Sequence, residues 1–279
     1  MPQALEIAAR DGYRLAATLH APRTANGRAV LVHSATGVGR HYYGKFAEHL
    51  AGRGFIVLTF DYRGIGESRR EPLRKLRARM RDWAQLDAAA ALDFLARAAP
   101  GAALFCVGHS FGANALGLVP GIERYRGAVF VGAQSGYWRH WPGVTRAGMW
   151  LLTHALLPSV SALLGRFPMH ALGMGEDLPG GVAREWASWC RHPRYAAGAV
   201  GAEGYARLSA PIRSYWASDD RYAPRAAAEA LFELYPNAVS KELVALDARA
   251  HGGIGHFGFF RERLRDTLWR DMAEWLERL

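Results

Sequence analysis

Short, continuous apolar runs alternate with longer amphipathic segments along the first half of the chain. The runs RAVLVH, FIVLTFD, AALFCVGHS and RGAVFVGA are typical of strands buried on both faces. The segments between them, at 43–54 and 80–101, place apolar residues at helical spacing and end at glycine. Residues 3–9 and 13–20 alternate polar and apolar positions, which predicts an antiparallel strand pair. The pattern predicts an α/β protein with a mostly parallel central sheet flanked by helices.

The alternation stops near residue 135 and resumes near residue 208. The intervening segment is rich in Trp, Gly, Pro and His, and after it strands and helices alternate again to the last predicted helix, at 259–279. We therefore expect a core formed by residues 1–134 and 208–279 and a helical cap insertion formed by residues 135–207. The cap is expected over the carboxyl edge of the sheet, where open α/β sheets bind ligands.

The strongest chemical motif is GHSFG at residues 108–112, which fits G-x-S-x-G. It lies between a predicted buried strand and a predicted helix, the context in which such a turn exposes a nucleophilic serine. The small neighbours Gly108 and Gly112 permit the sharp turn, and the Phe111 N–H would face a developing oxyanion. The motif predicts Ser110 as a nucleophile.

A serine nucleophile needs a base, and the base needs an acid that orients it. The segment SYWASDDRYAP offers Asp219 and Asp220, and the segment AHGGIGHFGFF offers His251 and His256. From the residues alone both choices stay open in each pair. A metal site at the two histidines is disfavoured because no convincing third ligand accompanies them.

Four motifs together resemble the α/β-hydrolase superfamily, close to its serine-aminopeptidase-like and predicted esterase branch. They span residues 30 to 260, nearly the whole chain, and are GHSFG, HSATG at 33–37, DYRGIGES at 61–68 and DRYAP at 220–224. The resemblance implies the α/β-hydrolase fold. It also implies a mainly structural role for 61–68, with its Asp and Arg pairing locally, and a packing role for His33.

The resemblance also assigns roles in the site. The D-x-x-x-P loop implies Asp220 as the triad acid, with Asp219 as the alternative. The Gly-His step before the last helix implies His256 as the base, with His251 as the alternative.

The oxyanion hole would combine the Phe111 N–H with the N–H of Ala35 or of Thr36. That choice stays open because Ser34 stands where many relatives have glycine.

The sequence therefore predicts a serine hydrolase that acts through an acyl-enzyme on a carboxylic ester or related small acyl substrate. It predicts no cofactor and no metal. Two alternatives remain, an acyltransferase on the same triad and a non-catalytic binding module on a hydrolase scaffold. The sequence determines neither the acyl group nor the oligomeric state.

The formal net charge of +10 could indicate a nucleic-acid or membrane partner. All but three of the 35 basic residues are arginine, which points to composition bias, and no nucleic-acid motif accompanies the charge. We expect no nucleic-acid partner. The stretch at 69–81 concentrates seven basic residues, and we interpret it as a solvated face, with an anionic substrate or surface as the alternative.

Other features concern location and the cap. Two cysteines, of which Cys106 is expected in the core, predict a cytoplasmic protein, and the apolar segment at 148–165 is a poor membrane span because it contains His154, Pro158 and two serines. The segment at 174–181 lacks the ligand spacing of a calcium loop. The cap tryptophans are expected to wall an apolar pocket, with three candidates for polar contacts to substrate. The tryptophans are Trp138, Trp141, Trp150, Trp186 and Trp189, and the polar candidates are Arg139, Arg191 and His192.

Overall fold

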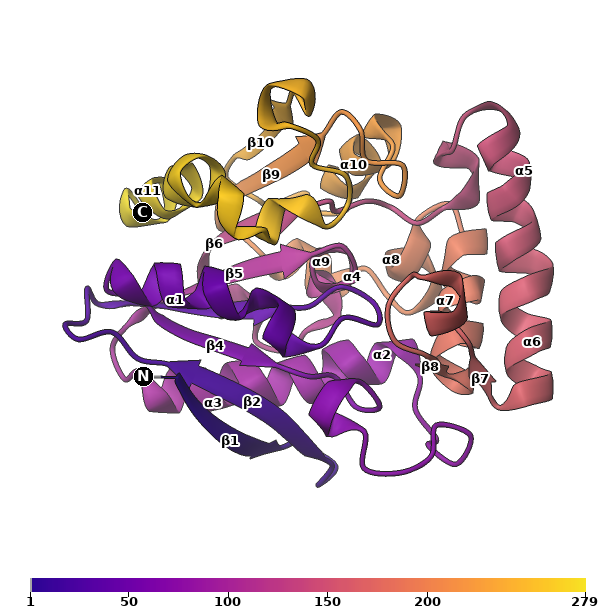
Figure 1. The fold of residues 1–279 in the computed structure, drawn as a ribbon, viewed down its shortest axis with the longest axis horizontal. Coiled ribbons are helices and arrows are strands. Elements are labelled where there is room, and N and C mark those ends of the chain that lie inside the picture. Colours follow the sequence, from indigo (N-terminus) through magenta and orange to yellow (C-terminus); the bar gives the residue numbers. More distant parts are fainter. Residues whose placement is uncertain (1) are drawn as a thin grey trace.

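A central eight-stranded sheet organises the computed structural model, which describes residues 2–279 (Figure 1). Its strand order is β1-β2-β4-β3-β5-β6-β9-β10, in which β2 pairs antiparallel with β1 and β4 and every other pairing is parallel. The strands are β1 Pro2–Ala8, β2 Arg14–His20, β3 Arg28–His33, β4 Ile56–Phe60, β5 Ala103–His109, β6 Tyr125–Val131, β9 Ile212–Ala217 and β10 Lys241–Leu246. The α/β-hydrolase fold predicted from the sequence is confirmed.

Helices cover both faces of the sheet (Figure 1). On one face, Val30 and Val32 of β3 pack in a cluster with α1 and α11, while Leu31 between them packs in the opposite cluster with α3 and α10. This alternation explains why the strands read as continuous apolar runs. The helices of the core are α1 Gly44–Gly52, α2 Met80–Asp82, α3 Ala89–Ala98, α4 Phe111–Asn114, α10 Arg225–Phe232 and α11 Arg270–Glu277.

The structure corrects the sequence prediction at two helices. The helix after Ser110, expected over the whole run FGANALGLV, is only one turn long. After Ala115 the chain continues as a 3₁₀ turn, Leu116–Leu118, in which a Cβ at Gly117 would lie 2.2 Å from the Tyr205 ring. The last helix, expected from residue 259, begins only at Arg265. Before it, residues 258–260 and 262–264 form two short 3₁₀ turns.

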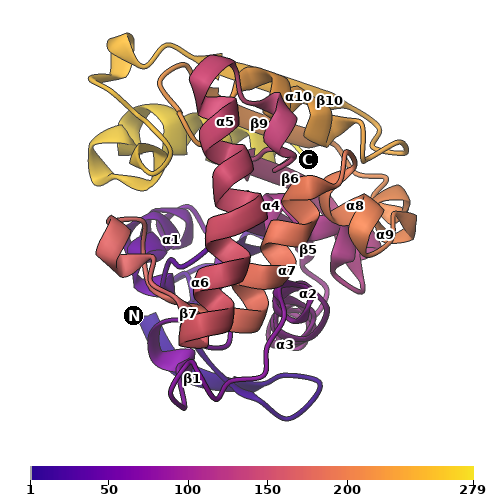
Figure 2. The same ribbon diagram turned by 90° about the vertical axis from the view of Figure 1, so that its right-hand side faces the viewer.

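The segment at 135–207 lies across the carboxyl edge of the sheet (Figure 2). It is not wholly helical, because β7 and β8 form a two-stranded antiparallel sheet. Its boundaries as a separate cap stay a prediction. Its elements are α5 Gly143–Leu151, α6 Leu157–Leu164, β7 Arg166–Phe167, β8 Leu178–Pro179, α7 Gly180–Arg191, α8 Tyr195–Ala199 and α9 Glu203–Arg207.

The two helices α5 and α6 form one continuous helix, Gly143–Leu164, of 22 residues. A π-helical turn at Leu152–Leu156 joins them, just before Pro158. Proline lacks an N–H and crowds the preceding turn, and a wider turn accommodates it without breaking the helix. This helix packs along α7 at the outer side of the segment (Figure 2).

Candidate active site

Ser110 occupies a strained turn at the carboxyl end of β5. Its backbone has φ 50° and ψ −114°, and its N–H donates to the Val131 carbonyl at 2.9 Å. A Cβ at Gly112 would lie 2.3 Å from the His33 carbonyl oxygen, and one at Gly108 would lie 2.7 Å from the Ala113 nitrogen. The motif glycines are therefore required by close backbone contacts, as expected of a turn that exposes a serine.

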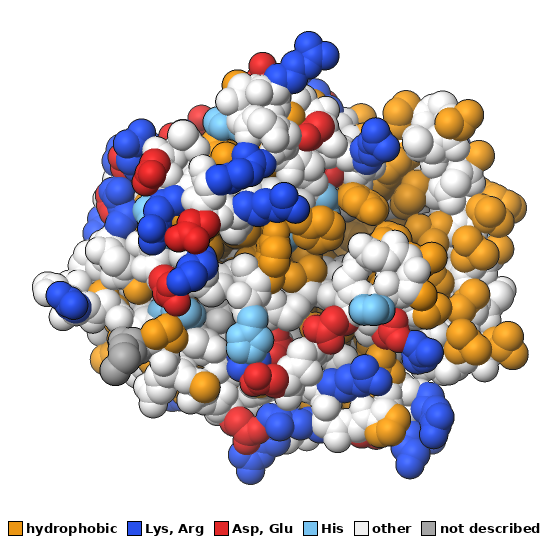
Figure 3. Space-filling model, in the orientation of Figure 1, with side chains coloured by type: hydrophobic (Ala, Val, Ile, Leu, Met, Phe, Trp, Pro, Cys, Tyr) orange, Lys and Arg blue, Asp and Glu red, His pale blue; other side chains and the backbone are white. Residues whose placement is uncertain are grey.

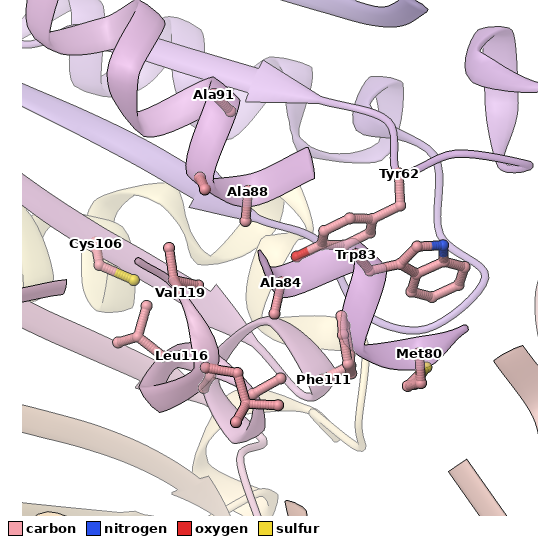
Figure 4. Packing of buried hydrophobic residues seen from close by; sticks show 14 of the residues in the cluster. Tyr62, Met80, Trp83, Ala84, Ala88, Ala91, Cys106, Phe111, Leu116 and Val119 are labelled. Carbon is pink, nitrogen blue, oxygen red and sulfur yellow. The ribbon is translucent and has the colours of Figure 1, made fainter. Parts of the chain in front are cut away.

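Phe111 anchors the turn in the core. Its ring packs edge-on against Tyr62 and Trp83 (Figure 4). The rings of Tyr62 and Trp83 stack on each other with their centroids 5.0 Å apart. The Phe111 N–H is the first of α4, so no residue within that helix accepts from it. Packing of the side chain fixes the direction of this backbone donor beside Ser110.

His256 lies in the loop after β10 and is paired with Asp220. Its Nδ1 is 2.8 Å from Asp220 Oδ2, and both side chains are buried. Asp220 Oδ1 accepts from the N–H groups of Tyr222 and Ala223, which fixes the carboxylate. His251 does not line the cavity that holds Ser110 and His256.

Asp219 makes a different set of contacts. Its carboxylate accepts from the N–H groups of Ile254 and Gly255, at 3.0 and 2.7 Å. It therefore holds the backbone just before His256, while its neighbour Asp220 holds the imidazole. The two adjacent acids fix the same loop at two different points.

Gly132, at the end of β6, was not singled out from the sequence. It has φ +55°, and a Cβ there would lie 3.1 Å from His256 Nδ1 and 3.2 Å from Asp220 Oδ2. The position after a buried strand and the glycine itself were the available signals.

Gly132→Ala is expected to lower kcat about 10- to 100-fold, because the methyl group would displace the imidazole or the carboxylate from their contact. Gly101→Ala is the matched control, because Gly101 also has a positive φ, +77°, but a Cβ there would meet no atom within 4 Å. Steady-state kinetics with thermal unfolding would compare them. If Gly101→Ala lost as much activity as Gly132→Ala, the effect would be due to backbone strain and not to the contact with His256 and Asp220.

A buried chain of hydrogen bonds connects the loop after β3 to the loop of His256. The Ala35 N–H donates to Tyr43 Oη at 2.9 Å, and Tyr43 Oη lies 2.8 Å from His109 Nδ1. His109 Nε2 lies 2.9 Å from the His256 carbonyl oxygen. Tyr43 and His109 thus position both loops without facing the cavity, since neither lines it.

Tyr43→Phe is expected to lower the free energy of unfolding by about 1–3 kcal/mol, because it leaves the buried Ala35 N–H and His109 Nδ1 without their partner. It is also expected to lower kcat about tenfold through misplacement of the two loops. Tyr125→Phe, which removes the buried hydroxyl 2.9 Å from His33 Nε2, is expected to affect stability alone. Equal losses of kcat in both variants would contradict the positioning role.

His33 is a packing residue, as predicted. It is buried, Tyr125 Oη is its hydrogen-bond partner, and burial lowers the pKa of His33 to about 3. Burial, with the nearby His256 as a second cause, also holds the pKa of His109 well below its ordinary value.

Acid is expected to destabilise the protein through these two histidines. Their folded pKa lies below the unfolded value near 6.5, so their contribution is complete above about pH 6.5 and declines as the pH falls. At about pH 5.5, each of these two histidines would lower the free energy of unfolding by about 1.4 kcal/mol. Denaturant unfolding across this range measures the slope. His33→Gln should flatten this slope, because it removes one of the two buried imidazoles.

The segment 61–68 is structural, but its Asp and Arg do not pair with each other. Asp61 accepts from the Arg40 guanidinium and backbone, while Arg63 binds Asp87 and Asp11. The prediction of local pairing was wrong because both side chains bind residues 21 to 52 positions away along the chain instead of each other.

The loop at 174–181 makes hydrogen bonds to the backbone of two other loops. The Glu176 carboxylate accepts from the Gly66 N–H, and the Glu176 N–H donates to the Gly37 carbonyl at 2.7 Å. These contacts hold Met174 of the same loop at the wall of the cavity described next.

Ser110 and His256 open on one cavity of about 110 Å³. Its walls are mostly apolar, and the cap tryptophans Trp141 and Trp186 contribute as expected. Arg139, Arg191 and His192 do not line it: the Arg191 guanidinium donates to the Thr153 carbonyl instead. The lining is Ala35, Thr36, Ser110, Phe111, Asn114, Gln134, Gly136, Trp141, Met149, Leu152, Met169, Met174, Trp186, Cys190, Tyr195, Tyr222, His256 and Phe257.

Asn114 and Gln134 supply polar groups to this wall, and sequence reasoning missed both. Each amide binds the other residue: Asn114 Nδ2 donates to Gln134 Oε1, and the Gln134 N–H donates to Asn114 Oδ1. Asn114 follows Ser110 by four residues and Gln134 follows a strand end, which were the available signals. Within residues 2–279, no three His, Cys, Asp or Glu side chains are grouped so that they could hold a metal ion.

Comparison with known proteins gives a family and a fold. A family model described as serine aminopeptidase, S33, matches residues 25–171, a range that contains Ser110 and ends before Asp220 and His256. No curated protein sequence matches significantly.

Solved structures resemble the chain at 16–18% identity, which shows the fold alone. The esterase domain of a Rhodothermus marinus protein has a TM-score of 0.62 at 18% identity, over 100% of this chain and 98% of that one. The protein DcsB, in complex with its substrate analogue, has a TM-score of 0.70 at 16% identity, over 100% and 99%. A thermophilic esterase from Thermogutta terrifontis has 0.60 at 16% identity, over 99% and 98%.

Proposed function

The chain belongs to the serine aminopeptidase S33 family of α/β hydrolases, and from this premise we propose that it is a serine hydrolase acting on uncharged carboxylic esters. The observation that carries the proposal is the buried His256–Asp220 pair at the same cavity as the strained Ser110. Two buried cysteines, both free, suit the reducing cytoplasm that we propose as its location.

In the proposed mechanism, Ser110 Oγ attacks the ester carbonyl while His256 Nε2 takes its proton. Asp220 accepts from Nδ1–H, which selects the tautomer with a free Nε2 and stabilises the imidazolium. Collapse of the tetrahedral intermediate releases the alcohol, which takes the proton from His256. Water then attacks the acyl-enzyme with His256 again as base, and Ser110 is regenerated.

We assign the oxyanion hole to the Phe111 N–H and the Thr36 N–H. The Ala35 N–H already donates to Tyr43, whereas the Thr36 N–H has no hydrogen-bond partner among residues 2–279. Thr36 lines the cavity beside Phe111 and Ser110. This arrangement supplies two backbone donors near the nucleophile.

The lining of the cavity favours an uncharged substrate. Among the residues described, it contains no Asp, Glu, Lys or Arg. A peptide with a free α-amino group would bury its ammonium without a carboxylate partner, at a large desolvation cost. The volume of about 110 Å³ is smaller than the engineered cavity of about 150 Å³ that admits benzene, so we propose a short acyl group.

A fluorophosphonate probe tests the nucleophile. We expect one covalent label per folded chain, located at Ser110 by peptide mass spectrometry, and none on Ser110→Ala or on heat-unfolded protein. Absence of labelling on folded wild type would overturn the proposal and favour a binding module.

A substrate panel tests the chemistry. We expect short neutral p-nitrophenyl esters to be cleaved faster than long-chain esters and aminoacyl p-nitroanilides. Preferred cleavage of the anilides would contradict the proposed ester hydrolysis and would identify the protein as an aminopeptidase. Preferential acyl transfer to an added alcohol would identify an acyltransferase.

A further inference from the structure

The outer face of the helix Gly143–Leu164 is apolar and exposed. Only 17% of the residues in its 18-residue apolar window are buried, although the helix contains a single charged residue, Arg146. Its exposed side chains include Val144 at 88% and Leu163 at 85%, with Trp150, Leu151, Leu156 and Leu164 each near half. Figure 3 shows the resulting apolar surface over α5 and α6, at the right of the molecule. Apolar patches of this kind mark contact surfaces.

Arginines lie at the carboxyl end of the same helix. Gly165, which ends α6, lines an open cleft of about 350 Å³ together with Arg74, Arg77, Arg79 and Arg184. All four are exposed, and the lining contains no carboxylate. The cleft gathers part of the basic stretch at 69–81, whose Leu73, Leu76 and Ala78 are buried and thereby turn the arginines outward.

The inner face of the helix is held by the rest of the fold. Thr153, Leu157 and Ser161 are fully buried, and the Arg184 guanidinium donates to the Ser161 carbonyl. The helix is long and apolar enough to cross a membrane, but a spanning position would detach this face from α7 and expose it. That the segment does not span a membrane stays a prediction. A helix lying flat at a membrane interface would keep its inner face packed on the fold and bury its apolar outer face in lipid.

We propose that the outer face of Gly143–Leu164 and the arginine cleft together form a docking surface for an anionic lipid bilayer. Apolar side chains would enter the interface while the arginines bind lipid phosphates, a combination that gives stable peripheral attachment. Of the four cleft arginines, only Arg79 has an acidic partner among residues 2–279, Asp82. A second copy of the chain would add further arginines and no carboxylate to the cleft, so the charge favours anionic lipid. Met149 and Leu152 of this helix line the catalytic cavity, so docking would bring the cavity next to the bilayer.

Vesicle co-sedimentation of the full chain carrying Ser110→Ala tests the surface without dependence on catalysis. We expect binding to phosphatidylcholine vesicles that contain about 30% phosphatidylglycerol, weaker binding to phosphatidylcholine alone, and weakening by salt. Loss of ester hydrolysis would therefore leave this result unchanged, so failure of either proposal is distinguishable.

Paired variants separate the two components. Leu151→Glu with Leu163→Glu should weaken binding at least about tenfold, whereas Val239→Glu with Leu279→Glu, at similar exposures elsewhere, should not. Arg74→Ser with Arg77→Ser should weaken it about tenfold or more, whereas the equally charged change Arg97→Ser with Arg126→Ser should not.

Three results would overturn the proposal. One is failure of the parent protein to bind the anionic vesicles. Another is equal weakening by test and control pairs. The third is a dimer in analytical ultracentrifugation that only Leu151→Glu with Leu163→Glu dissociates, which would identify the face as a self-association surface.

Discussion

Replacing Ser110 or His256 with alanine is expected to lower kcat/KM for a short p-nitrophenyl ester by about 10⁴-fold or more, while His251→Ala changes it less than about threefold. Ser110 and His256 share the cavity, and the imidazole is fixed by Asp220. His251 lies outside the cavity lining, in a 3₁₀ turn that contacts Arg263 through its carbonyl. Initial-rate kinetics on the three purified variants measure the difference.

The double variant Ser110→Ala with His256→Ala provides an internal check. Groups that act as one unit are not additive, so it is expected to lose no more activity than either single variant. Circular dichroism and thermal unfolding should show the native fold in each. A large loss in His251→Ala with little loss in His256→Ala would exchange the roles of the two histidines.

The core of the fold was predictable because its signals are local. The runs at 29–32 and 128–131 are apolar at every position because both faces of the sheet are covered. The short helix after Ser110 was not predicted, and the 3₁₀ turn that follows it packs Gly117 against the ring of Tyr205, a residue far along the chain that the local pattern does not reveal.

Much of the site was likewise predictable where a single residue type is required at a turn. The glycines around Ser110 and the Gly-His step before His256 carry such signals. The residues that position these catalytic candidates carry weaker sequence signals or none. Tyr43 acts through His109, 66 positions away, and has no distinctive local pattern. Gly132 is marked only as a glycine after a buried strand, and its contacts to Asp220 and His256 are with residues far along the chain.

Asp220→Asn is expected to lower kcat by about 10³- to 10⁴-fold with the fold retained. Asparagine keeps the oxygen that accepts from Tyr222 and Ala223, but it can place an NH₂ group opposite His256 Nδ1. An amide donor there favours the tautomer whose Nε2 carries the proton, so the imidazole cannot accept from Ser110. Because binding contacts are unchanged, KM should change little.

Asp219→Asn is the matched control, since the same chemical change is made one residue earlier. Its carboxylate holds the Ile254 and Gly255 N–H groups, so the expected effect is a loosened loop. We expect a loss of about 1–2 kcal/mol in the free energy of unfolding and a fall in kcat of about tenfold or less. Kinetics and denaturant unfolding on both variants distinguish the roles. If Asp219→Asn caused the larger loss of kcat with unchanged stability, Asp219 would be the triad acid, because a residue that only supports a loop cannot remove turnover while the loop stays folded.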